Sequence, residues 1–262
     1  DGAGKRYVLR RKPPGVLLKS AHAVDREYRV VTALGQHTTV PVARTHVLCT
    51  DETVIGTWFY IMDHVDGRMF WDAAIPQVEN DERAALFDAM NATIASLHSV
   101  DHEAIGLSDY GKPGNYFARQ ITRWAGQYEQ DEDAGRFDAM DRLVKWLPDN
   151  IPPGDETTIV HGDFRIDNMI FHPTEPRVLA ILDWELSTLG HPLADFSYHL
   201  MMYRMPPSGF TGLLGVDLDP LNIPHESDYI ARYCARTGRD PIPDKDMNFY
   251  VAFNMFRLAA IL

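Results

Sequence analysis

Cysteine is scarce in this chain, with only Cys49 and Cys234 among 262 residues. Two cysteines are too few for a disulfide framework, and their spacing is not that of a zinc site. The sequence also lacks any apolar run near the roughly 20 residues that a membrane-spanning helix needs, and its first residues lack the apolar centre of a signal peptide. We therefore expect a reducing, cytoplasmic location and no membrane association.

Basic residues are also few relative to acidic ones. The chain has 25 Lys and Arg against 37 Asp and Glu, a formal net charge of −12 at pH 7. Such a charge argues against a broad surface for nucleic acid or anionic lipid, because phosphate groups would be repelled. It would suit a cationic substrate, but solubility alone explains it more simply, so the charge of the substrate stays open.

The first 62 residues have the pattern of a small mixed region. Runs rich in β-branched and aromatic residues predict strands at 7–11, 45–49 and 57–62. Between the first two, apolar residues at helical spacing predict a helix over 22–35, with Gly35 placed to end it. The polar segment 63–67 then predicts a hinge between two lobes.

From residue 68 to residue 262 the sequence is mainly helical in pattern. The predicted helices cover 81–100, 116–128, 137–147, 192–203, 226–236 and 247–262. Three apolar runs are too short for helices and predict small strands at 158–161, 169–171 and 178–182. The expected fold class is α+β, with a small β-rich N-terminal lobe over 1–62 and a larger, mainly helical C-terminal lobe over 68–262.

The segment IVHGDFRIDNMIF places a polar loop between two of these short strands. In it His161 and Asp163 are separated by one residue, and Asn168 follows after four more. The next predicted strand ends in ILDWE and delivers Asp183. Three oxygen-bearing side chains can therefore converge at the ends of neighbouring strands.

This set of side chains suits phosphoryl transfer. Magnesium binds carboxylate and carbonyl oxygens and commonly uses one or two protein ligands plus phosphates and water, a partial shell that Asn168 and Asp183 would supply. Asp163 would stay off the metal and accept the proton of an attacking hydroxyl. The simpler alternative is a hairpin in which His161 and Asp163 only satisfy backbone groups, and the loop spacing alone is not decisive.

Five motifs in this chain resemble those of the aminoglycoside phosphotransferase and choline kinase group, most closely the phosphotransferase-like modules associated with acyl-CoA dehydrogenases. The motifs are VLRRKPPG at 8–15, SAHAVDREYRV at 20–30, FYIMDHVDGR at 59–68, VHGDFRIDN at 160–168 and LDWELSTLGHPLADF at 182–196. The resemblance implies a bilobal protein-kinase-like fold, ATP and Mg²⁺ as cofactors and a small-molecule hydroxyl as acceptor. It also implies an association with an acyl-CoA dehydrogenase.

The resemblance assigns nucleotide-binding roles near the N-terminus. Arg10 matches the strand cation that grips the nucleotide phosphates, and Glu27 matches the helix glutamate that pairs with it. A lysine usually holds the first of these positions, so Lys12 is the reserve candidate for the phosphate contact. Glu27 could instead be an exposed helical charge. In the hinge, Asp63 through its carbonyl and Val65 through its amide match the groups that bind adenine.

Further roles are implied around the catalytic loop. Arg165 matches a cation near the transferring phosphate, but it could equally be a loop arginine paired with Asp167. His161 is expected to brace the loop rather than carry a proton. Asp195 matches a buried acid that supports the loop, with an ordinary helix-start acid as the alternative. Glu185 is a weaker candidate for metal contact.

One feature of the group is not found in this sequence. The group covers the phosphates with a glycine-containing hairpin, whereas Gly2 and Gly4 are the only glycines before the first predicted strand. A GxxxxGK phosphate loop is absent too. We therefore expect the natural protein to extend beyond this N-terminus.

Two other functions compete with phosphotransfer to a small molecule. A nucleotide-binding regulatory module of the same fold would explain Arg10 and the absent glycine loop, and a metal-dependent hydrolase would need a dense cage of His and Asp. The acceptor itself stays open, with a hydroxyacyl compound implied by the dehydrogenase association. For an anionic acyl thioester, we expect basic residues in the cleft, such as Arg119, Arg123, Arg204 or Arg232, and for an aminoglycoside we expect acidic ones.

Overall fold

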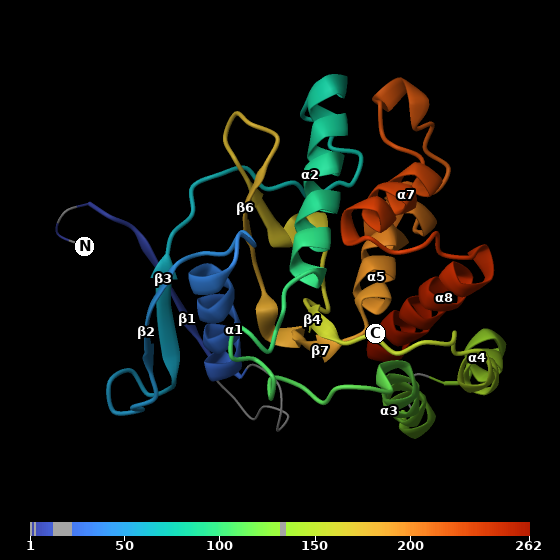
Figure 1. Ribbon diagram of the computed structural model, residues 1–262, viewed down its shortest axis with the longest axis horizontal. Helices are drawn as coiled ribbons and strands as arrows, with labels where there is room; N and C mark the ends of the chain where they lie inside the picture. Colours follow the sequence, from blue (N-terminus) through green and yellow to red (C-terminus); the bar gives the residue numbers. More distant parts are fainter. Residues whose placement is uncertain (1, 3, 13–22, 132–134) are drawn as a thin grey trace.

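The computed structural model describes residues 2, 4–12, 23–131 and 135–262. Its N-terminal part is a three-stranded antiparallel sheet in the order β1-β3-β2, next to one helix (Figure 1). The strands are β1 (Tyr7–Arg11), β2 (Thr45–Cys49) and β3 (Phe59–Asp63). The register pairs Arg10 with Tyr60. The predicted strands are present. Residues 13–15, the PPG that ends the motif VLRRKPPG, lie outside the described residues.

Helix α1 (Val24–His37) packs on this sheet through its apolar side. Val24, Val30 and Leu34 are fully buried, because their spacing brings them to one face of the helix. The prediction that Gly35 ends the helix was wrong, since the helix continues to His37. A Cβ atom at Gly35 would lie 3.2 Å from Cγ2 of Val42, so the glycine serves close packing and not termination.

Seven helices dominate the described residues after the sheet. They are α2 (Asn80–His98), α3 (Tyr116–Gln130), α4 (Asp138–Asp149), α5 (Pro192–Arg204), α6 (Pro207–Phe210), α7 (Glu226–Thr237) and α8 (Asp244–Ile261). Helix α5 packs against α8, and α2 packs against α7. The ring of Phe196 on α5 stacks on Tyr233 of α7 at 3.8 Å between centroids. The short α6 was not predicted, and α8 begins three residues before its predicted start.

Two small antiparallel sheets lie between the N-terminal sheet and the helices (Figure 1). In one, β4 (Thr158–Val160) pairs with β7 (Thr188–Gly190), and in the other, β5 (Met169–Phe171) pairs with β6 (Val178–Ile181). Strand β7 was not predicted, because three residues ending in glycine carry no strand signal of their own. At Gly190 a Cβ would lie 2.7 Å from the ring of Tyr116, so only glycine fits this close approach.

The chain passes from the N-terminal sheet to the helical part directly against β5. Arg68 forms an isolated antiparallel bridge with Phe171. A Cβ at Gly67 would lie 2.3 Å from the carbonyl oxygen of Phe171, so the crossing depends on a glycine there. This fits a hinge at 63–67, and the division of the chain into lobes at these boundaries remains a prediction.

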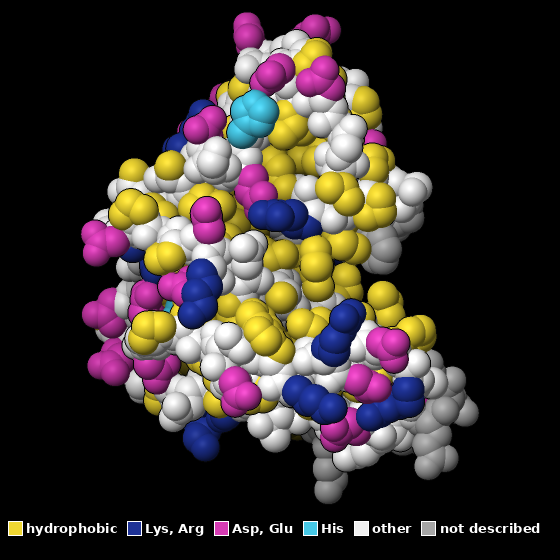
Figure 2. Space-filling view, turned by 90° about the vertical axis from the view of Figure 1, so that its right-hand side faces the viewer, with side chains coloured by type: hydrophobic (Ala, Val, Ile, Leu, Met, Phe, Trp, Pro, Cys, Tyr) yellow, Lys and Arg dark blue, Asp and Glu magenta, His cyan; other side chains and the backbone are white. Residues whose placement is uncertain are grey.

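No helix among the described residues is long and apolar enough to cross a membrane. The face shown in Figure 2 is hollowed, and hydrophobic side chains line much of the hollow. Acidic and basic side chains gather around it, with several basic ones in the lower part of the view. Charge is therefore distributed unevenly over this face, although the chain is acidic as a whole.

Candidate active site

The loop between β4 and β5 is anchored by hydrogen bonds to the carboxylate of Asp195, on α5. One carboxylate oxygen of Asp195 accepts from the backbone N–H of Gly162 at 2.8 Å. The other accepts from the backbone N–H of His161 at 2.7 Å and is 3.2 Å from Nε2 of His98. Burial alone would raise the pKa of Asp195, but the hydrogen bonds from the side chain of His98 and the backbone of His161 hold it below its usual value. The loop is thus anchored by an ionised, buried carboxylate.

His161 connects this loop to the chain segment that carries Asp183. Its Nε2 is 2.8 Å from the carbonyl oxygen of Leu182, and its Nδ1 accepts from the backbone N–H of Asp163 at 3.2 Å. We therefore assign the neutral tautomer with its proton on Nε2. Because both ring nitrogens are engaged and the side chain is fully buried, His161 braces the loop.

The carboxylate of Asp163 is held by two neutral donors. Asn168 donates through Nδ2 to Oδ2 of Asp163 at 2.9 Å and to its backbone oxygen at the same distance. The hydroxyl of Tyr198, on α5, donates to Oδ1 at 2.6 Å. Since its nitrogen faces Asp163, the amide of Asn168 keeps its oxygen as the group that a metal could use.

Asp183 follows β6 and lies beside the catalytic loop. The backbone N–H of Leu182 donates to the carbonyl oxygen of Asn168 at 2.8 Å, which ties the two strand ends together. Asp183 adopts φ 62° and ψ 61°, a left-handed conformation that costs free energy for a residue other than glycine. Its carboxylate is 40% exposed, so a metal–nucleotide complex could reach it.

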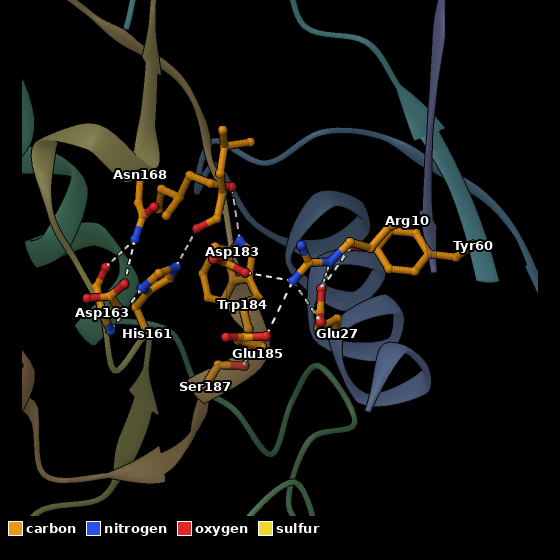
Figure 3. Close-up of polar contacts among 12 residues, drawn as sticks. Arg10, Glu27, Tyr60, His161, Asp163, Asn168, Asp183, Trp184, Glu185 and Ser187 are labelled. Carbon is orange, nitrogen blue, oxygen red and sulfur yellow. Dashed lines mark hydrogen bonds and ion pairs between the residues drawn. The ribbon is translucent and has the colours of Figure 1, made fainter. Parts of the chain in front are cut away.

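Arg10 joins the N-terminal sheet to this centre through three carboxylates. Its guanidinium donates to Glu27 at 3.0 and 3.2 Å and to Oδ1 of Asp183 at 2.7 Å, and it lies 3.6 Å from Glu185 (Figure 3). Glu27 is 2% exposed and also accepts from the hydroxyl of Tyr60 at 3.3 Å. The resemblance-based pair of Arg10 and Glu27 is therefore formed, and Glu27 is not an exposed helical charge.

Burial and neighbouring charge act in opposite directions within this ion cluster. Burial raises the pKa of Glu27, and Asp183 and Glu185 raise it further, against the lowering effect of Arg10. Burial would lower the pKa of Arg10, but its bonds and charge interactions with Glu27 and Asp183 raise it overall. Arg10 therefore stays cationic and offsets the charge of the carboxylates around it.

Two other predicted cations lie in different surroundings. Lys12 places its ammonium over the ring of Trp58 at 4.7 Å, so the structure puts Arg10 against Asp183 and gives Lys12 another contact. Arg165 pairs with Asp167, with Nε 3.0 Å from Oδ1. The pairing that was weighed as an alternative role for Arg165 is thus present, and its contact with the transferring phosphate stays a prediction.

The hinge residues lie at the end of β3. The backbone N–H of Asp63 donates to the carbonyl oxygen of Arg44 at 2.8 Å. Hydrogen bonds from Lys5 at 2.8 Å and His46 at 2.7 Å lower the pKa of the Asp63 carboxylate. These contacts occupy the amide and side chain of Asp63 and leave its predicted adenine contact to the carbonyl. Val65 is half-buried, and its role remains a prediction too.

The donor set fits magnesium delivered with a nucleotide. Within the described ranges, no group of three or more His, Cys, Asp or Glu side chains is placed to hold a metal ion. Mg²⁺ keeps several waters and takes one or two protein oxygens plus substrate phosphates, which the amide oxygen of Asn168 and the carboxylate of Asp183 can supply. The hydrolase alternative required a dense cage, and the described residues do not support it.

Sequence reasoning missed Tyr198 and Arg257. Tyr198 lies one helical turn after Asp195, so the i+3 spacing could have placed both on the side of α5 that faces the loop. Arg257, near the end of α8, donates to the carbonyl oxygen of Gly162 at 2.8 Å. No local pattern could have found it, because 95 residues separate the two partners.

A pocket that is open to solvent adjoins the catalytic loop. Its lining residues are Ala73, Arg165, Ile166, Asp167, Tyr198, His199, Met201, Met202, Met205, Thr211 and Leu258. Of the basic residues that were expected in the cleft for an anionic acceptor, none lines this pocket: Arg119, Arg123, Arg204 and Arg232 lie elsewhere. Arg165 is the basic residue in its wall.

Comparisons with known proteins agree with this geometry. A family model described as the phosphotransferase enzyme family matches residues 1–234. A crystal structure from Ralstonia eutropha, described as a candidate aminoglycoside phosphotransferase, is 53% identical with a TM-score of 0.90 and covers 98% of this chain and 75% of its own. An aminoglycoside-3'-phosphotransferase of type VIII shares the fold alone, at 18% identity and a TM-score of 0.63 over 97% of this chain and 86% of its own.

Two curated relatives are named as acyl-CoA dehydrogenases. The probable acyl-CoA dehydrogenase IBR3 of Arabidopsis thaliana is 48% identical over 98% of this chain and 32% of its own length. Acyl-CoA dehydrogenase family member 10 of Mus musculus is 45% identical over 99% of this chain and 24% of its own. The chain therefore spans a third or less of these relatives. The predicted kinase-like α+β fold and the resemblance drawn from the motifs are confirmed, and the chain belongs to the phosphotransferase enzyme family.

Proposed function

We propose that this protein transfers the γ-phosphate of ATP, with Mg²⁺, to a hydroxyl group of a small molecule. The observation that carries the proposal is the half-buried carboxylate of Asp163, which Asn168 orients beside the end of β6 that presents Asp183. A carboxylate in this position can orient an incoming hydroxyl and accept its proton as the phosphoryl group moves.

The remaining residues supply charge and position. Magnesium would neutralise the phosphates at Asn168 and Asp183, since a loose transition state gains most from charge neutralisation and in-line placement. Arg10, fixed by the buried Glu27, presents a guanidinium beside Asp183, where nucleotide phosphates would lie. Arg165 is assigned the transferring phosphate, which requires it to leave Asp167.

ATP is proposed as the donor on the likeness of the fold. A structure of the same fold, aminoglycoside phosphotransferase APH(4)-Ia, is described as a complex with AMP-PNP and hygromycin B, at 16% identity and a TM-score of 0.61. In the present chain the backbone carbonyl of Asp63 and the amide of Val65 are assigned to adenine. The assignment is tested by comparing ATP with GTP as donor.

A hydroxyacyl compound is the acceptor class that the pocket supports best. Met201, Met202 and Met205 give the pocket beside the catalytic loop flexible apolar walls, which suit an acyl chain better than a polycationic sugar. Relatives named as acyl-CoA dehydrogenases favour the same class and an association with such an enzyme. None of the basic residues that were expected for an anionic acyl thioester lines this pocket, so the choice of acceptor rests on the apolar walls and on the relatives.

The deciding experiment is ATP turnover with Mg²⁺ against a panel of hydroxyl compounds that includes hydroxyacyl thioesters and aminoglycosides. Wild type should phosphorylate a panel member, and Asp163→Asn should lose this activity by at least about a thousandfold while its affinity for ATP is retained. If both proteins bind ATP and neither turns over, the regulatory-module alternative becomes the better account.

A further inference from the structure

Tyr198 lies between the catalytic loop and the apolar pocket. Its hydroxyl donates to Oδ1 of Asp163 at 2.6 Å, on the carboxylate oxygen that Asn168 does not bind. The same side chain forms part of the pocket wall. Tyr198 therefore connects the pocket wall to the carboxylate of Asp163, which does not itself line the pocket.

The ring of Tyr198 is itself held in place. The guanidinium of Arg257 lies over the ring at 5.3 Å and donates to the carbonyl oxygen of Gly162 at 2.8 Å. Arg257 is 8% exposed, so its position is set by packing. Helices α5 and α8 thus fix two consecutive loop residues, Gly162 through its backbone and Asp163 through its side chain.

The phenol acts as a permanent donor in this contact. Burial raises the pKa of Tyr198, and the charge of Asp163 raises it further, so the hydroxyl keeps its proton near neutral pH. With one bond to each oxygen, Tyr198 and Asn168 together prevent the carboxylate from rotating. Each oxygen still has a lone pair for an incoming hydroxyl.

We propose that Tyr198 is a positioning residue for phosphoryl transfer, which orients the carboxylate of Asp163 toward an acceptor hydroxyl arriving from the apolar pocket. This inference rests on the proposed function. Helix α5 then has two roles: it anchors the loop through Asp195 and orients Asp163 through Tyr198. Tyr198 acts through Asp163 and exchanges no proton with the acceptor.

The test uses Tyr198→Phe, which keeps the ring in the pocket wall and under Arg257 and removes only the hydroxyl. We expect kcat to fall about ten- to a hundredfold, the range for losing a hydrogen bond to a charged group, with KM for ATP and for the acceptor within about twofold of wild type. The matched control is Tyr203→Phe on the same helix, whose hydroxyl donates to the carbonyl oxygen of Pro224 at 2.9 Å. Its kcat should stay within about twofold.

A double variant separates positioning from general damage. In the Asp163→Asn background, Tyr198→Phe should lower the residual single-turnover rate by less than about twofold, because the residue acts only through that carboxylate. The melting temperatures should show the same non-additivity and also report whether each variant folds.

Three results would overturn the inference. An unchanged or increased kcat in Tyr198→Phe would do so, and an increase would mean that the phenol occupies the place of the acceptor hydroxyl. A full additional loss in the Asp163→Asn background would mean that Tyr198 acts by another route. An active wild type with an unaffected Tyr198→Phe refutes this inference alone, whereas a wild type that phosphorylates no panel member refutes the proposed function and this inference with it.

Discussion

The two aspartates of the site are held in opposite ways. Asp183 accepts from a cation, Arg10, which also serves Glu27 and lies near Glu185. Asp163 accepts only from neutral groups among the contacts described, an amide and a phenol. The first arrangement suits a carboxylate that binds a metal ion beside phosphates. The second suits a carboxylate that accepts a proton, because its partners are neutral.

The two arrangements also differ in the distance along the chain that they span. Arg10 and Asp183 are 173 residues apart and join the N-terminal sheet to the strand pair β5–β6, whereas Asp163 is 5 residues from Asn168 and 35 from Tyr198. The charged cluster therefore depends on how two parts of the molecule lie together. The neutral cluster depends on one loop and one helix. Four predictions test the contrast.

The largest effect is expected at Asp183. Asp183→Asn keeps the shape of the side chain but removes the charge that would bind the metal, so the transfer rate should fall by at least about a thousandfold. Glu185→Gln, at the edge of the same cluster, should cost only about tenfold. Steady-state kinetics across a Mg²⁺ titration measure both, and equal losses in the two variants would contradict the metal assignment.

Removing the cation of Arg10 should show how much the free energy of unfolding depends on its pairing with the buried Glu27. Arg10→Met leaves Glu27 buried without its partner, which should lower the free energy of unfolding by about 3 kcal/mol at pH 8, the low end for broken buried pairs because Arg10 is a third exposed. Urea unfolding measures this. The loss should shrink as pH falls toward 5, because a proton on Glu27 removes the unpaired charge. Adding Glu27→Gln should restore part of the stability, and no restoration would contradict this account.

A buried histidine that contacts the loop of Asp163 should make the stability of the protein depend on pH. His199, fully buried against Phe164 and 2.7 Å from the hydroxyl of Tyr229, has its pKa lowered by burial from 6.5 to about 4. The unfolded chain takes up the proton first, so stability is lost as pH falls from about 6.5 toward 4, by about 2 kcal/mol at pH 5 relative to pH 7.5. Urea unfolding of His199→Gln at both pH values should show a pH dependence smaller by that amount, and an unchanged dependence would contradict it.

The smallest effect is expected at Lys12, the reserve candidate for the phosphate contact. Its ammonium lies over the ring of Trp58, so Lys12→Met should change kcat and KM for ATP by less than about twofold and stability by less than about 0.5 kcal/mol. The same kinetic assay of Arg10→Met should show a far larger rise in KM for ATP. The reverse order would assign the phosphate contact to Lys12.

Local patterns predicted most of the secondary structure and the loop that carries Asp163 and Asn168. Helical periodicity found the long helices because each buries an apolar face, and their ends differ from prediction by a few residues. Strand β7 and helix α6 were missed because neither is long enough to show a period. Gly35 misled the prediction, since a glycine that packs closely against Val42 looks the same in sequence as one that ends a helix.

By itself, the sequence determined which chemical groups are available and in what order. Asp163, Asn168 and Asp183 stand at the ends of short apolar runs, and such runs deliver their end residues to neighbouring positions. Only the tertiary structure decided that Arg10 lies against Asp183 and that Tyr198 and Arg257 secure the catalytic loop. The physical reason is that these contacts join residues 35 to 173 positions apart. Their geometry is set by the packing of α5, α8 and the N-terminal sheet, and local spacing indicates only that Tyr198 shares a side of α5 with Asp195.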